Sequence, residues 1–111
     1  MRYFHTVVLE RMTTHSQDFS TEPYETAWAS EAIFFIRVYS ISESDTSLDS
    51  RVQLSVDGID WVDDDLKFPT INKEGTYLLR VSHFGGWLRL KNVIKGKNPS
   101  LRLTVHLVLK E

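Results

Sequence analysis

The sequence contains no cysteine, no long apolar run and no recognisable catalytic motif. Without cysteine there is no disulfide framework, so stability depends on a hydrophobic core, which 111 residues are enough to bury. The longest uncharged apolar stretch, Ala32–Ile36, is far too short to cross a bilayer, and we expect no membrane contact. The N-terminus has no small-residue cleavage site, so we expect no signal peptide and a cytoplasmic or particle-associated location.

The missing catalytic signatures point away from an enzyme. There is no Gly-x-Ser-x-Gly elbow, no phosphate-cradling glycine loop and no cysteine nucleophile. The four histidines, at positions 5, 15, 83 and 106, lack the spacing of metal ligands. We therefore expect no catalytic residues and no cofactor. An enzyme would need a pair of acids that converge from separate loops.

Charge is unevenly distributed, although the formal net charge is only −2. Residues 1–50 carry eight acidic and three basic side chains, whereas residues 75–111 carry seven basic side chains and one acid. Such a chain could associate head to tail or offer a basic face to an acidic partner. Alternatively, strands from the two halves interleave and the asymmetry averages out.

Alternation of apolar and polar residues with a period of two is the clearest structural signal, and it is typical of half-buried strands. It is strongest over residues 101–110, where the residues expected to face the core are Leu101, Leu103, Val105, Leu107 and Leu109. Arg51–Asp57 repeats the pattern, with Val52, Leu54 and Val56 inward. Tyr77, Leu79 and Val81 form a third set.

Ala32–Ile41 differs because both of its faces are apolar. Such a strand in a small domain needs cover from a loop or from another subunit. The Arg11–Ser30 connection is the internal candidate for this cover. Within it, Thr21–Glu25 has the pattern of one short helical turn, with Thr21 as the cap and Pro23 in the first turn.

Turn signals separate these segments. Ser42–Ser50 is polar and is expected to be the most mobile loop, while Asp57-Gly58 and Gly85-Gly86 are hairpin signals. Short strands at this spacing predict an all-β fold, an antiparallel β-sandwich or jelly roll of about seven to eight strands with at most one short helical turn. Residues 1–111 form a single domain in this prediction.

An acidic cluster follows the first hairpin signal and consists of Asp57, Asp60, Asp63, Asp64 and Asp65. Carboxylates on a flexible loop are ligands for Ca²⁺, so these residues are weak calcium candidates. Their spacing is not that of an EF-hand. Turn formation by Asp57-Gly58, and solubility and edge protection by the other acids, explain the cluster without a metal.

The second hairpin signal leads to a candidate binding patch. If Gly85-Gly86 is a two-residue hairpin loop, Val81 faces Leu90 and His83 faces Leu88 on the inner side. The outer side then carries two aromatic and three basic side chains, namely Phe84, Trp87, Arg80, Arg89 and Lys91.

Opposed cations and an exposed aromatic pair are both unfavourable, so we expect an acidic or flat partner, either a protein subunit or a sugar ring, to cover this patch. Alternatively, Trp87 is tucked under the Lys95–Pro99 turn. A single aromatic pair near an acidic loop counts against nucleic acid.

The motif Ser-x-Asp-Gly-x-x-Trp at Ser55–Trp61, followed by Gly75-Thr76-Tyr77 and Trp87-Leu88-Arg89-Leu90, resembles discoidin-like jelly rolls. It is also similar to small β-sandwich proteins of phage and phage-derived particles. The first motif lies near the sialidase Asp box, which has one more residue between Asp and Gly. The resemblance covers about the C-terminal half of the chain and implies a sandwich architecture, and discoidin-like domains often bind carbohydrate.

Locally, the chemistry of the motif is that of a turn. Asp57-Gly58 makes the turn, Ser55 or Asp57 bonds its amides, and Trp61 is expected to return to the core.

Together these observations predict a non-enzymatic structural or assembly protein that self-associates or docks on a larger particle. The alternative is a carbohydrate-binding module, with or without calcium. The apolar faces of Ala32–Ile41, the outward Phe84/Trp87 pair and the divided charge all favour the first hypothesis, in which the partner is a second copy of the chain or another protein.

Overall fold

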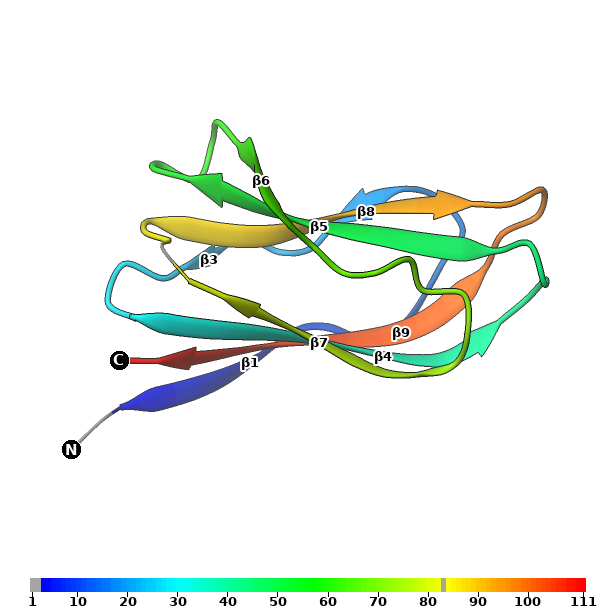
Figure 1. The fold of residues 1–111 in the computed structure, drawn as a ribbon, viewed down its shortest axis with the longest axis horizontal. Coiled ribbons are helices and arrows are strands. Elements are labelled where there is room, and N and C mark those ends of the chain that lie inside the picture. The colour runs from blue at the N-terminus through cyan, green and yellow to red at the C-terminus, as the bar shows by residue number, and fades with distance from the viewer. Residues whose placement is uncertain (1–2, 83) are drawn as a thin grey trace.

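The computed structural model describes residues 3–82 and 84–111, and these residues form an antiparallel β-sandwich of nine strands (Figure 1). The strands are β1 (Phe4–His15), β2 (Phe19–Ser20), β3 (Tyr24–Glu25), β4 (Glu31–Ile41), β5 (Ser47–Ser55), β6 (Val62–Lys67), β7 (Gly75–Val81), β8 (Trp87–Lys95) and β9 (Leu101–Lys110). The described residues contain no helix, hence none that could span a membrane. The predicted fold class is confirmed.

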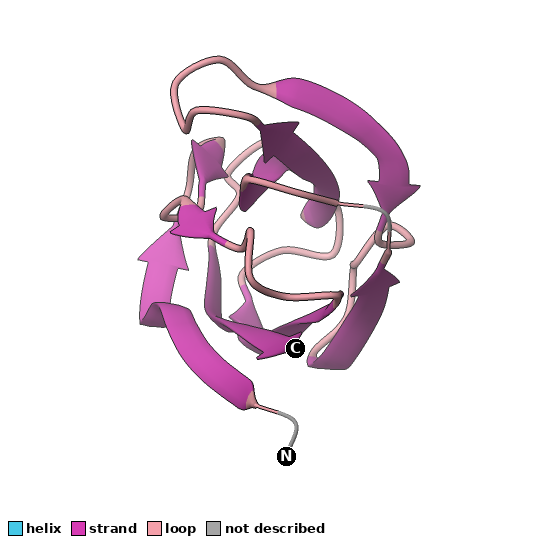
Figure 2. Cartoon of the chain, turned by 90° about the vertical axis from the view of Figure 1, so that its left-hand side faces the viewer, coloured by secondary structure: helices cyan, strands magenta, loops and turns pink. Residues whose placement is uncertain are grey.

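The strands form two layers around one interior (Figures 1 and 2). The four-stranded sheet has the order β1-β9-β4-β7, and the five-stranded sheet has the order β2-β8-β5-β6, with β3 also paired to β8. In the first sheet, β9 from the basic half of the chain lies between β1 and β4 from the acidic half. The strands therefore interleave, as one of the two interpretations of the charge distribution expected.

The core follows the predicted alternation most closely in β9. All five of its expected inward residues, from Leu101 to Leu109, are at most 1% exposed. Phe34 and Ile36 of β4 are completely buried beside them. Burial of one such side chain contributes about 1.5–3 kcal/mol to stability, so apolar packing between the sheets holds a fold that has no disulfide.

The connection between β1 and β4 runs to the opposite sheet, where β2 and β3 pair with β8. The predicted helical turn at Thr21–Glu25 is therefore wrong. The Thr21 hydroxyl accepts a hydrogen bond from the Leu90 amide (2.9 Å), and the Thr21 amide donates to the Leu90 carbonyl (3.0 Å). Because both the hydroxyl and the amide of Thr21 are hydrogen-bonded to the backbone of β8, Thr21 does not cap a helix.

The predicted mobile loop Ser42–Ser50 is also partly wrong, because β5 begins at Ser47. The polar residues of this segment suggested a solvent-exposed loop, but Ser50 is 1% exposed and its hydroxyl donates to the Asn92 side chain within the interior. At the other end of this segment, β5 stops at Ser55. Val56, predicted to face inward, is 89% exposed because the chain has already entered the turn.

The predicted Gly85-Gly86 hairpin is wrong as well. β7 pairs with β4 in the four-stranded sheet, whereas β8 pairs with β5 in the five-stranded sheet. Leu90 accordingly faces Val52 and Leu88 faces Leu54, while His83 lies outside the described residues. The chain crosses between the layers here, and Gly86 (φ 76°) anchors the crossing through its carbonyl, which accepts hydrogen bonds from the Thr26 amide and hydroxyl.

Candidate functional site

The outer face of the five-stranded sheet gathers three of the five predicted binding residues. Along β8, Leu88, Leu90 and Asn92 are buried, so the intervening Trp87, Arg89 and Lys91 point outward by the period of the strand. The alternative position of Trp87, under the Lys95–Pro99 turn, is not observed. Its indole ring instead lies against Gly58, where an added Cβ would stand 3.2 Å from the ring.

The other two predicted residues lie elsewhere. Arg80 is exposed on β7, opposite Ile33 of the four-stranded sheet, and Phe84 is half-buried against the hydrophobic core. The physical reason is the crossing at Gly86, which separates the residues before it from those after it. The five-residue patch therefore does not exist as one surface.

Arg89 is the centre of a polar chain on this face. Its Nε donates to Gln53 Oε1 at 2.7 Å, and Gln53 Nε2 donates in turn to Asp63 Oδ1 at 2.7 Å. The guanidinium carbon lies 4.2 Å from the centroid of the Trp61 ring, a cation–π contact. Partial burial lowers the pKa of Arg89 from its ordinary value.

Trp61 thus covers the arginine on the outer face and does not return to the core as predicted. Gln53 was not among the predicted site residues, because its importance comes from a cross-strand position.

The Ser55–Trp61 turn has the hydrogen bonds expected of it. The Ser55 hydroxyl accepts from the Gly58 amide (2.8 Å), and Asp57 Oδ1 accepts from the amides of Ile59 (2.9 Å) and Asp60 (3.1 Å). These amide bonds, together with the one donated by the Ser55 hydroxyl, hold the pKa of Asp57 below its usual value. Gly58 has a φ of 81°, which favours glycine. The motif is a structural support for Trp87.

The five aspartates of the acidic cluster do not form a cation-binding arrangement. Across residues 3–82 and 84–111, no three acidic or histidine side chains converge in a way that could hold a metal ion. Asp57 is engaged in the turn, Asp63 accepts from Gln53, and Asp64 Oδ1 accepts from the Asp65 amide. Turn chemistry and side-chain pairing account for these three residues.

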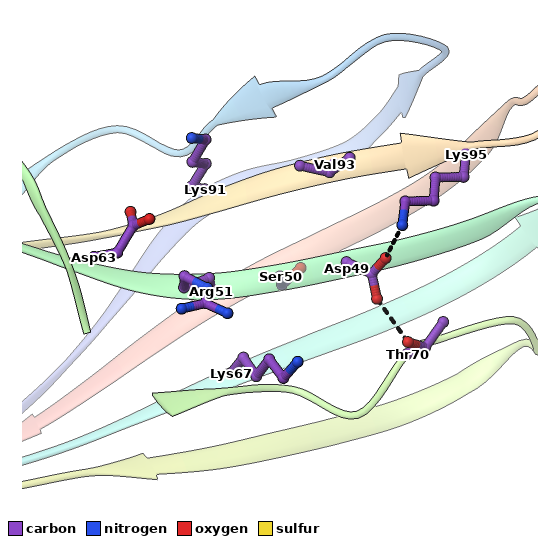
Figure 3. Close-up of a pocket in the computed structure, with 9 residues that line it drawn as sticks. All are labelled: Asp49, Ser50, Arg51, Asp63, Lys67, Thr70, Lys91, Val93 and Lys95. Atoms are coloured by element: carbon purple, nitrogen blue, oxygen red, sulfur yellow. Dashed lines mark hydrogen bonds and ion pairs between the residues drawn. The ribbon is translucent and has the colours of Figure 1, made fainter. Parts of the chain in front are cut away.

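A groove of about 440 Å³ lies on the same outer face, across β8, β5 and β6 (Figure 3). We call it the cationic groove because four basic and two acidic side chains line it. Its lining residues are Asp49, Ser50, Arg51, Asp63, Lys67, Thr70, Lys91, Val93 and Lys95. Asp63 belongs both to the groove and to the Arg89 chain, so the groove adjoins the Trp61 and Trp87 end of the sheet.

The register of the sheet places three of these cations in one row. Arg51 is the cross-strand partner of Lys91 on β8 and of Lys67 on β6, and Figure 3 shows the three side chains one below another. Of the three, only Lys91 was predicted to belong to a binding site. Arg51 and Lys67 are visible in the sequence as ordinary strand cations, and only the strand order makes them neighbours.

Asp49 marks the other end of the groove. Its Oδ1 accepts a hydrogen bond from the Thr70 hydroxyl at 2.6 Å, and its Oδ2 lies 3.4 Å from Lys95 Nζ (Figure 3). The bond from Thr70 is the main cause that lowers the pKa of Asp49, and Lys95 adds to it against an opposing effect of burial. Asp49 is therefore a charged acceptor within a mainly basic surface.

The outer face of the four-stranded sheet carries a cluster of apolar side chains bordered by polar and charged ones such as Arg37, Arg80 and Lys110, and the connection between β1 and β4 does not cover it. His106 of β9 is the cross-strand partner of Val8 on β1 and of Phe35 on β4, and Phe35 is in turn the partner of Leu78 on β7. Val108 of β9 is the partner of Ile33 on β4. We call the surface of Val8, Ile33, Phe35, Leu78 and Val108 the apolar face.

Val8 is 37% exposed and Leu78 is 45% exposed, and Phe4 projects at one corner with 67% exposure. Two hollows of about 410 and 340 Å³ share Val108 as a lining residue.

Comparisons with known proteins give a distant structural likeness. No protein-family model matches the chain, and no curated protein matches it. The chain is similar to a solved structure of a family two carbohydrate esterase from Cellvibrio japonicus, with 13% identity and a TM-score of 0.43. The alignment covers 99% of this chain and 34% of that one, so the chain spans about a third of the esterase's length. A likeness at this level carries no argument about function.

Proposed function

We propose that this domain is a non-enzymatic assembly protein that self-associates through the apolar face. The observation that carries the proposal is the exposure of Phe4, Val8 and Leu78 on a sheet surface that residues 3–82 and 84–111 leave open. Exposed apolar patches of this kind mark interaction sites, because covering them with a partner removes apolar area from water.

The shape of the face favours a second copy as the occupant. Phe4 and Leu78 project from opposite edges of the sheet, on β1 and β7, and two hollows that share Val108 lie on the same surface, one of them beside Phe4. Projections and hollows on one surface allow two copies related by a two-fold axis to fill each other's depressions. The contact is then isologous and closed.

Pairing of β1 edges is a less favourable route to association. β1 is an edge strand, but its register shifts at Glu10 and again before Thr13. Met12 between them has a φ of 46°, and its carbonyl and amide bond to the Arg102 and Thr104 side chains of β9. Such bulges twist an edge and protect it against another strand.

Analytical ultracentrifugation over a range of protein concentrations tests the proposal with a matched pair of variants. Leu78→Glu places a charge on the apolar face, whereas Val56→Glu places the same charge on an exposed turn beside the other sheet. The wild type and Val56→Glu are expected to form dimers, and Leu78→Glu is expected to remain monomeric. A monomeric wild type at high concentration, or equal effects of the two variants, contradicts the proposal.

A second candidate function is carbohydrate binding on the opposite sheet. The specific observation in its favour is that Trp61, Trp87 and Arg89 lie together next to the cationic groove, since sugar sites combine aromatic rings with a few placed polar groups. A glycan array with and without calcium tests it. Binding lost in Trp87→Ala supports this function, and silence of the folded wild type across the array eliminates it.

A further inference from the structure

We propose that the cationic groove binds an acidic oligosaccharide, whose carboxylates pair with the row Lys91–Arg51–Lys67 and whose hydroxyls donate to Asp49 and Asp63. The inference rests on the second candidate function, because it assigns a site and a substrate class to carbohydrate binding. It does not depend on self-association, since the groove and the apolar face belong to opposite sheets.

The row of cations is the first support. Lys91, Arg51 and Lys67 are directly opposite one another on three adjacent strands, so the backbones of the outer two are about 10 Å apart. Like charges in opposed positions destabilise a sheet. Within the described part of the chain, Lys67 and Lys91 have no carboxylate partner within ion-pair distance, and Arg51 Nη1 donates only to the Asp64 carbonyl. An anion across the row removes this repulsion.

The carboxylates of Asp49 and Asp63 restrict the class of anion that the groove can bind. Asp49 and Asp63 stand at its two ends, and their negative charges disfavour a ligand that presents only phosphates or carboxylates. Both accept hydrogen bonds from hydroxyl or amide groups, as Asp49 already does from Thr70. A ligand that presents both carboxylates to the cations and hydroxyl donors to the aspartates satisfies the whole surface, and each unit of a uronic acid chain carries both groups.

The dimensions and the neighbouring rings agree with such a ligand. A volume of about 440 Å³ lies within the range of small-molecule sites. The planar guanidinium of Arg51 can bind a carboxylate through two hydrogen bonds. Asp63 connects the groove to the half-buried rings of Trp61 and Trp87, so an aromatic surface adjoins the groove.

Isothermal titration calorimetry with tetragalacturonic acid tests the inference. The folded wild type is expected to bind it, and more weakly at higher salt because the charges are exposed to solvent. Arg51→Gln and Lys91→Gln are each expected to weaken binding about tenfold, the effect of one lost charge-assisted hydrogen bond. Lys97→Gln, which removes an exposed cation from the turn before β9, is the matched control and is expected to bind like the wild type.

Three further ligands define the class. A neutral galactose tetramer, inorganic phosphate and polyglutamate are each expected to bind at least tenfold more weakly than tetragalacturonate. Equal binding of phosphate or polyglutamate overturns the inference in favour of a general anion site. Equal binding of the neutral tetramer overturns it but leaves carbohydrate binding intact. Failure of tetragalacturonate to bind overturns the inference, whereas carbohydrate binding as such is eliminated only if the glycan array is also silent. Leu78→Glu is expected to bind tetragalacturonate normally, so the result is independent of assembly.

Discussion

Replacement of Gly86 by alanine tests the crossing between the two sheets, which separates Trp87, Arg89 and Lys91 from Arg80 and Phe84. Gly86 has a φ of 76°, and a Cβ at this position would collide with the backbone oxygen of Ser55. The left-handed backbone costs an alanine roughly 1–2 kcal/mol, and relief of the collision disturbs the hydrogen bonds from Thr26 to the Gly86 carbonyl. We expect Gly86→Ala to lower the free energy of unfolding by about 2–4 kcal/mol.

Gly85→Ala is the matched control. Gly85 has no positive φ, and an added Cβ there meets no atom within 4 Å. Because alanine restricts the unfolded chain more than glycine does, we expect this variant to be unchanged or stabilised by about 0.4–1 kcal/mol. Urea denaturation followed by tryptophan fluorescence measures both values, and thermal unfolding should show a decrease of roughly 4 °C or more per kcal/mol for Gly86→Ala.

The two variants distinguish between two paths of the chain from β7 to β8, a two-residue hairpin and the observed crossing between the sheets. A two-residue type I′ hairpin needs a positive φ at both central residues, so in that geometry both alanine variants are destabilised. In the observed crossing only Gly86 is sensitive. Equal destabilisation of the two variants, or a neutral Gly86→Ala, would mean that β7 leads into β8 by a different path.

Three further predictions concern the turn and the sheet beside it. Arg89→Ala loses a charged hydrogen bond to Gln53 and the contact with Trp61, so urea denaturation should show a loss of about 2–3 kcal/mol, whereas Lys91→Ala should change stability by less than about 0.5 kcal/mol. Equal losses would contradict the assigned role of Arg89.

Val52→Thr buries a hydroxyl at a position that is 0% exposed and should cost about 1–3 kcal/mol by the same assay, while Val56→Thr at 89% exposure should be neutral. The pKa values of Asp49 and Asp57 are lowered in the fold, so their stabilising effect is complete above the unfolded value of 3.8 and is lost as pH falls below it. Asp57→Asn should therefore reduce the melting temperature at neutral pH and flatten its decrease below about pH 4, and an acid transition identical to that of the wild type would show that the carboxylate is not involved.

The accuracy of the sequence-based predictions depended on how local each interaction is. The burial of β9 and the hydrogen bonds of Ser55 and Asp57 were predicted correctly, because alternation and turn chemistry act between residues close together in the chain. The start of β5 was missed because Ser50 is buried through a bond to Asn92 on another strand. Polarity by itself gave no sign of such a partner.

In the candidate site, too, the local features were predicted correctly and the contacts between strands were not. Trp87, Arg89 and Lys91 were predicted to share a face, which the period of a single strand is enough to decide. Their supposed neighbours Arg80 and Phe84 were assigned by assuming a hairpin, and the structure places them on another sheet and against the core. The residues that line the groove with Lys91 come from β5 and β6, with Thr70 from the segment after β6.

The sequence by itself determined the class of fold, the strands with strong alternation and the local geometry of the Ser55–Trp61 turn. It also showed, through the absence of cysteine, that apolar packing holds the domain together. Only the tertiary structure decided which strands are neighbours, and with them the cationic row, the contact of Arg89 with Trp61 and the open apolar face. The physical reason is that strand order follows from how the two sheets bury their common core, which a period of two along each strand does not specify.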